Sequence, residues 1–279
     1  MASLHGDNNT PRPGAKIFDI AYSHESTVAA FKSYYEFLAK MYMDPDMIKT
    51  PPAAGWVHMT PERMQALGKS EKVITLLRHL PYVHHVLGRP ETHSGPACIF
   101  ADWERKARDL AAHPELTGFD VLCTTEPENV PPHVIGISQG PYKMLLDTQL
   151  GLVYWNDCPP AIHEDPSHPI QPIQNDPIDY ANDEELGWRC APAWSIPEFF
   201  EVLKHHFVNL DCVPLSRRLV EEGWYGEERD MPDNLGACRV AAEIYRRHGW
   251  PDVEKFRKDQ CMAELEREIP ERFPEQFFL

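Results

Sequence analysis

His133 and Asp147 are the two residues whose types and positions best suit proton transfer. His133 stands directly before one apolar run, and Asp147 ends the next one. Histidine titrates near neutral pH, and a carboxylate beside it can orient the ring and stabilise its charged form. If the two runs are strands, a His and an Asp at their ends form an acid–base pair over a pocket. In the other interpretation, Asp147-Thr148 only makes a turn with Gly151.

Tyr154 and His163 complete the candidate catalytic set. Tyr154 lies in a third apolar run, and His163 begins the segment His163-Glu164-Asp165-Pro166-Ser167-His168. The imidazoles and carboxylates of this segment are ligand types that zinc accepts. A proline-rich loop does not hold ligand geometry, however, and the helical H-E-x-x-H spacing is absent. We therefore interpret the segment as solvated and expect no metal site there.

Three other patterns suggest chemistry only weakly. His84-His85 and His205-His206 are adjacent pairs, and neighbours on a helix point in different directions, so we expect one ring of each pair to pack and the other to face water. The letters of Gly136-Ile137-Ser138-Gln139-Gly140 match a nucleophile elbow, but Pro141 follows where a helix should begin. Phosphate-loop, dinucleotide and kinase motifs are absent, so no cofactor is expected.

The composition excludes several classes of protein. The 279 residues include 43 acids and 27 bases, for a net charge of -16. A field of this sign repels nucleic acid and anionic membranes, and the sequence lacks an apolar stretch of about 20 residues that could span a bilayer. The seven cysteines are scattered without a C-x-x-C pair, which is typical of reduced thiols in a cytoplasmic protein.

The elements that must position these residues follow from apolar periodicity and turn signals. Runs at 134–137, 142–146 and 152–155, separated by Gly, Pro and Asp, predict a β-meander, and 119–124 predicts a further strand. Capping residues, prolines and helical spacing predict helices before and after the meander. The predicted helices cover 27–41, 60–68, 70–81, 103–112, 195–213, 233–247 and 252–268.

This order of elements predicts an α+β fold with a central antiparallel sheet flanked by N-terminal and C-terminal helices. We expect a disordered tail at 1–15 and a single domain over 16–279, with a long proline-rich loop at 159–187. Tryptophans gather near loops in the second half of the chain, where they either fill the core or line a ligand-binding face. The candidate binding residues are Trp155, Trp188, Trp194 and Trp224.

Several segments of the chain carry a resemblance to known families. They are Leu76–Tyr82, Pro131–Gly136, Leu146–Thr148 with Gly151–Trp155, Phe199-Phe200 with Val213-Pro214, and Ile244–Pro251. These segments resemble a large family of uncharacterised proteins from filamentous fungi. A strand ending in Asp147, a turn with Gly151, a strand ending in Trp155 and a late helix opening with Phe199-Phe200 also resemble the SUKH superfamily. That superfamily includes toxin-immunity proteins and a regulator of fungal cell-wall synthesis.

Two functions remain open from the sequence. The SUKH resemblance implies a cytoplasmic interaction module, whose acidic, aromatic-lined face would hold a protein partner or a small molecule. The titratable residues beside a long loop instead suggest a small-molecule enzyme of fungal specialised metabolism, which would use His/Asp acid–base catalysis without a nucleotide cofactor.

Overall fold

The structure, a computed structural model, describes residues 17–85, 91–113, 115–173, 184–223 and 232–274. The α+β class is confirmed. The expected tail at 1–15 and the candidate binding residue Trp224 lie outside the described residues. Within the described ranges, no helix is long and apolar enough to cross a membrane.

The largest sheet in the described residues has four antiparallel strands in the order β4-β6-β7-β8. These are β4 (Val134–Gly136), β6 (Lys143–Asp147), β7 (Leu152–Asn156) and β8 (Ala193–Ser195). The three apolar runs are therefore confirmed as strands. A single central sheet is not confirmed, because the remaining strands form three two-stranded sheets. Those sheets pair β1 (Ile48–Lys49) with β2 (Tyr82–Val83), β3 (Ile99–Phe100) with β5 (Ser138–Gln139), and β9 (Cys212–Pro214) with β10 (Val220–Glu222).

Both faces of the four-stranded sheet are buried, which explains why its strands are continuous apolar runs. Side chains alternate between the faces along each strand. One face contributes to the main core with Ile135, Leu146, Val153, Trp155 and Trp194. The opposite face forms a smaller cluster that includes Val134, Leu145, Leu152, Tyr154 and Trp188.

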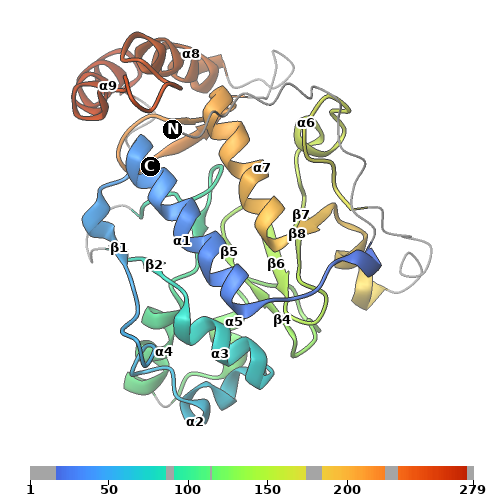
Figure 1. Cartoon of the computed structure of the whole chain (residues 1–279). Coiled ribbons are helices and arrows are strands. Elements are labelled where there is room, and N and C mark those ends of the chain that lie inside the picture. Colours follow the sequence, from blue (N-terminus) through green and yellow to red (C-terminus); the bar gives the residue numbers. More distant parts are fainter. Residues whose placement is uncertain (1–16, 86–90, 114, 174–183, 224–231, 275–279) are drawn as a thin grey trace.

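Helices α1 (His24–Met41) and α7 (Ile196–Asn209) lie side by side against the main core (Figure 1). Ser23 caps α1 by accepting a hydrogen bond from the backbone N–H of Ser26, and Pro197 lies in the first turn of α7. The rings of Phe31 and Phe200 join the two helices, with centroids 4.6 Å apart.

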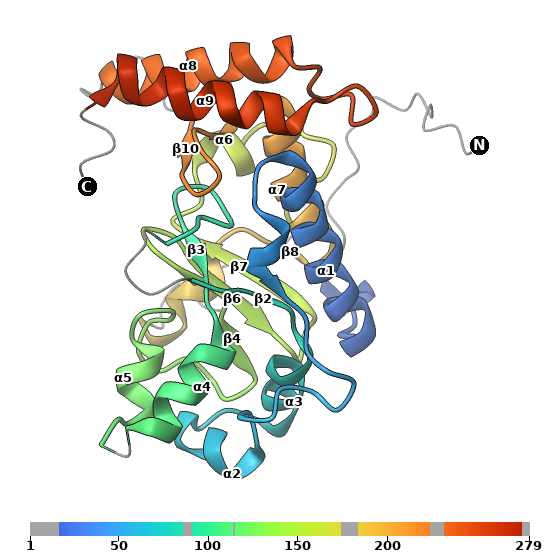
Figure 2. The same cartoon turned by 90° about the vertical axis from the view of Figure 1, so that its left-hand side faces the viewer.

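Six other helices gather at the two ends of the molecule. Helices α8 (Pro232–Arg247) and α9 (Lys258–Arg272) lie side by side at one end, and α2 (Pro61–Met64), α3 (Glu71–His79), α4 (Trp103–Ala112) and α5 (Gly118–Leu122) lie at the other (Figure 2). The ammonium of Lys258 donates to the carbonyls of Ala39 and Met43, and so ties α9 to the end of α1.

Three predicted segments differ from the structure. Residues 119–124 were expected as a strand, which is wrong, because a capping box between Thr117 and Asp120 starts α5 there. The predicted loop at 159–187 contains α6 (Pro160–His163) and the start of the 3-10 helix Glu184–Cys190, and its residues 174–183 lie outside the described part. The last helix begins at Lys258 rather than at 252.

Candidate functional site

The structure brings His133 and Asp147 together, as their positions at strand ends predict. Asp147 pairs with Val134 across β4 and β6, and its Oδ2 lies 3.8 Å from Nε2 of His133. The Asp147 side chain is fully buried, whereas that of His133 is 30% exposed. Asp147 Oδ1 accepts the backbone N–H groups of Gln149 and Leu150, and its Oδ2 accepts no hydrogen bond. One oxygen thus makes the expected turn while the other faces the imidazole, and an acid–base role for the pair stays a prediction.

The other two residues of the candidate catalytic set lie on other elements, β7 and α6. Tyr154 is buried on β7, two residues beyond Leu152, and its ring meets the ring of Trp188 edge-on at 5.1 Å. His163 is half-buried at the end of α6. His168, expected to be solvated, is instead buried.

The described tryptophans of the candidate binding face are core residues. Trp155 and Trp194 are fully buried in the main core, on the sheet face that meets α7. Trp188 is buried in the smaller cluster on the opposite face. These three indoles therefore pack in the two clusters that bury the opposite faces of the sheet, and they do not line an exposed surface.

A cavity of about 300 Å³ lies where α1 and α7 begin, and its lining includes Tyr22, Ser23, Gly151, Ser195 and Glu198. It reaches the turn that follows Asp147, but neither Asp147 nor His133 lines it. Gly151 has a φ of +76°, and a Cβ there would lie 2.8 Å from the backbone nitrogen of Tyr22. The turn thus needs glycine to approach the N-terminal segment this closely.

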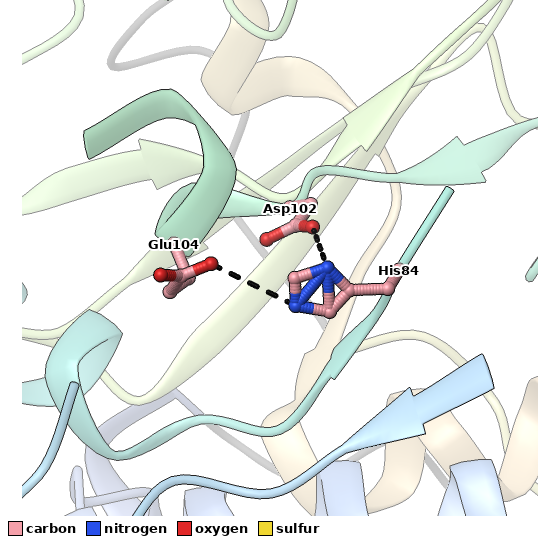
Figure 3. A group of neighbouring side chains, drawn as sticks. All are labelled: His84, Asp102 and Glu104. Carbon is pink, nitrogen blue, oxygen red and sulfur yellow. Dashed lines mark ion pairs between the residues drawn. The ribbon is translucent and has the colours of Figure 1, made fainter. Parts of the chain in front are cut away.

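A second group of titratable side chains forms around His84 (Figure 3). The His84 ring lies between two carboxylates, with Nδ1 3.3 Å from Asp102 Oδ2 and Nε2 3.7 Å from Glu104 Oε2. His84 follows β2, whereas both acids follow β3 at the start of α4. Asp102 caps α4, because its Oδ1 accepts the backbone N–H of Arg105 at 3.0 Å. The imidazole thus meets a helix N-terminus that already carries two acids.

Burial dominates the electrostatics of this group. The side chains of Asp102 and Glu104 are 3% and 7% exposed, whereas that of His84 is 25% exposed. Burial raises the pKa of the Asp102 carboxyl, although the Arg105 N–H and His84 oppose the rise. Asp102 Oδ2 accepts no hydrogen bond, while Arg108 Nε lies 3.0 Å from Glu104 Oε2. Two ionised carboxylates and one guanidinium leave the group with an excess of negative charge when His84 is neutral.

The sequence patterns missed this group. They paired His84 with its neighbour His85, whose Nδ1 instead accepts the backbone N–H of Thr92. Asp102 and Glu104 carried a detectable signal, because an acid directly before a predicted helix and another in its first turn are typical of a helix start. That signal indicates a cap, whereas the approach of His84 to it is a tertiary contact that local patterns do not predict.

The resemblances to fungal proteins and to the SUKH superfamily stay predictions, as does the interaction module that they imply. The distances, burial and charge of the candidate residues are the evidence on which a proposal for the function can rest. Compared with known proteins, the chain matches no family model, no curated protein and no solved structure.

Proposed function

We propose that the protein binds a divalent transition-metal ion of the zinc class through His84, Asp102 and Glu104. The observation that carries the proposal is the convergence of one imidazole and two carboxylates, whose ligand atoms all lie within 4.8 Å of one another. The buried Asp102 oxygen that accepts no hydrogen bond supports it, since a buried polar atom is normally paired. A cation at this point would supply the missing partner.

The spacing and chemistry of the three side chains suit such an ion. Ligands held about 2.1 Å from a tetrahedral ion lie about 3.4 Å apart. The ligand atoms here lie within 4.8 Å of one another, so small side-chain movements would bring them to that spacing. One nitrogen and two oxygens match zinc, manganese or iron better than an all-oxygen magnesium or calcium site. The two carboxylates face different ring nitrogens, so the partly exposed His84 ring must turn to present one nitrogen to both.

Protonated His84 bridging the two carboxylates is the competing state of the same group. Metal binding needs a neutral imidazole and ionised carboxylates, so a proton and a metal ion exclude each other here. The affinity for metal should therefore rise as the pH is raised. Three protein ligands would leave coordination positions open on the solvent side of His84, as in metal sites that act on substrates.

Zinc titration of the metal-free protein by calorimetry at pH 7.5 tests the proposal, with one ion expected to bind per chain. Asp102→Asn is the sharpest variant, because asparagine caps a helix as well as aspartate does but removes the charge. His84→Ala removes the nitrogen ligand. We expect each change to weaken binding by more than about tenfold, since even outer-shell partners of a metal contribute that much.

His113→Ala is the matched control. His113 Nδ1 lies 3.0 Å from Glu115 Oε1, so this pair repeats the His–carboxylate contact on the surface. Zinc affinity should be the same as in the wild type, because two exposed side chains do not fix a site. Absence of stoichiometric binding by the wild type, or equal affinity in the His84→Ala protein, would refute a metal site at His84.

The contact between His133 and Asp147 favours acid–base catalysis on a small molecule as a second function. The imidazole is partly exposed and is backed by a buried carboxylate with an open oxygen, which is the arrangement that orients a catalytic histidine. Hydrolysis of a panel of activated esters is the first activity to measure. His133→Gln should lower turnover by about 10²- to 10⁴-fold, whereas His113→Gln should leave it unchanged. Equal turnover by the His133→Gln protein would exclude this role.

A further inference from the structure

Three imidazoles from two separate segments of the chain lie close together at the end of α7. His168 comes from the segment after α6, and His205 and His206 come from the last turns of α7. The ring centroid of His168 lies 4.5 Å from that of His205 and 5.2 Å from that of His206, nearly parallel to the second ring. We name these three residues the histidine cluster. Neither the metal site nor the His133–Asp147 contact uses it.

His168 anchors an otherwise open segment. Ile162 and Ile173 are buried at the two ends of this stretch, and of the residues between them only His168 is buried, at 3% exposure. With its proton on Nδ1, the ring donates a hydrogen bond to the carbonyl oxygen of Ile170, 2.8 Å away. Ile170 is half-buried and also packs against the main core, so within residues 164–172 His168 supplies the buried contact and Ile170 a partial one.

The buried ring has no place for a second proton. Nε2 of His168 is buried and has no hydrogen-bond partner, which a neutral ring tolerates as an unused acceptor. A proton on both nitrogens would leave a buried charged donor without an acceptor, and such a group costs far more free energy than a neutral one. Protonation and burial of His168 therefore oppose each other.

The charged groups around the cluster do not reverse this balance. His205 and His206 face His168 from α7, and Asp165 faces it from its own segment. Asp211, which precedes β9, is engaged by His206, with Oδ2 3.0 Å from Nδ1. Burial lowers the pKa of His168 to about 4 despite the opposing effect of Asp165. Burial also lowers the pKa of His205, although Asp211 and Asp165 oppose that change.

We propose that the histidine cluster is a pH-sensitive latch, which holds residues 164–172 on α7 at neutral pH and releases them in mildly acidic conditions. The released segment exposes the face of α7 that carries His205 and His206. Because Ile162 and Ile173 stay anchored, the opening is local and leaves the four-stranded sheet intact.

The sign of the pH dependence follows from linkage. The open segment binds a proton with the ordinary histidine pKa of 6.5, whereas the closed segment binds it only near pH 4. The closed state is therefore fully favoured above about pH 6.5 and loses stability as pH falls from there toward 4. Between pH 7 and pH 5, this difference raises the opening constant on the order of 20-fold.

Hydrogen exchange followed by mass spectrometry, corrected for the intrinsic effect of pH, measures this opening in peptides that cover 160–173. We expect protection in the wild type to fall on the order of 20-fold from pH 7 to pH 5. His168→Asn keeps a side-chain partner for the Ile170 backbone but cannot titrate, so its protection should not respond to pH. His113→Asn, at an exposed position, should respond as the wild type does. No loss of protection in the wild type, or a full response in His168→Asn, would overturn the latch.

If residues 164–172 of the His168→Asn protein are unprotected at both pH values, the His205→Asn protein tests the latch instead. This change removes one of the two neighbouring imidazoles that lower the pKa of His168. The response to pH should then be smaller than in the wild type. A response of the same size would show that the cluster does not control the segment.

Discussion

Replacing Lys69 with methionine should destabilise the protein by about 3–5 kcal/mol, because it leaves the buried Glu126 without its cation. Nζ of Lys69 contacts Oε1 of Glu126, and both side chains are nearly inaccessible, at 3% and 4% exposure. Burial lowers the pKa of Lys69 and raises that of Glu126, and in each case the partner's charge opposes the change. Glu126 Oε2 also accepts the backbone N–H of Gly136, so the pair joins the start of α3 to β4.

Urea unfolding at pH 7 measures this loss. The double variant Lys69→Met with Glu126→Leu should lose less stability than the single variant, because no charge is then left unpaired. The loss in the single variant should also shrink as pH falls, since a protonated Glu126 needs no cation. Lys32→Met is the matched control, because Lys32 forms an exposed pair with Glu36 at 3.9 Å. Equal losses in the Lys69→Met and Lys32→Met proteins would contradict the prediction.

The sequence predicts the parts of the fold that are decided locally. The strands β4, β6 and β7 are apolar runs bounded by turn residues, and the register between the first two follows from the short chain that joins them. That is why the contact between His133 and Asp147 was predictable. Helices α2 and α3 follow the predicted caps Thr60 and Ser70, each of which accepts a backbone N–H in the first turn. Helix α1 was predicted from residue 27, whereas its cap is Ser23.

Long-range pairings decide the parts that the sequence does not reveal. Strands β1, β2 and β3 have only two residues each, so no periodicity identifies them or the position of His84 above α4. The buried partners Lys69 and Glu126 are separated by 57 positions, and each reads as an ordinary surface residue. The tryptophans near loops suggest a binding face, and the second layer that buries Trp188 becomes visible only in three dimensions.

Ser138 shows how a catalytic-looking pattern serves packing instead. Its side chain is buried, and its Oγ donates to the carbonyl of Tyr142 and accepts the backbone N–H of Met144. The hydroxyl thus holds the link between β5 and β6, and the expectation that Gly136-Ile137-Ser138-Gln139-Gly140 is no nucleophile elbow agrees with this geometry. Gly136 is glycine for a different reason, which is the close approach of another backbone segment.

Gly136→Ala should cause the second large loss of stability. A Cβ at this position would lie 2.3 Å from the carbonyl oxygen of Thr125 and 2.6 Å from its carbonyl carbon, so backbone would have to move. The movement would distort two hydrogen bonds. The Gly136 N–H donates one of them to Glu126, and Trp103 Nε1 donates the other to the Gly136 carbonyl. Overpacking alone typically costs about 1–3 kcal/mol, and the disturbed buried ion pair adds to that cost.

Gly187→Ala is the matched control for this change, because nothing lies within 4 Å of the Cβ that it would add. Its effect should stay within about 0.5 kcal/mol, as for other substitutions away from packed features. Thermal unfolding of the two variants beside the wild type measures the difference. In a protein that already carries Lys69→Met and Glu126→Leu, Gly136→Ala no longer disturbs a buried ion pair. The stability lost through Gly136→Ala should therefore be smaller there than in the wild type, but it should not vanish, because the clash between the two backbone segments remains. No loss there would mean that β4 tolerates the added methyl group and that the ion pair alone makes the site sensitive.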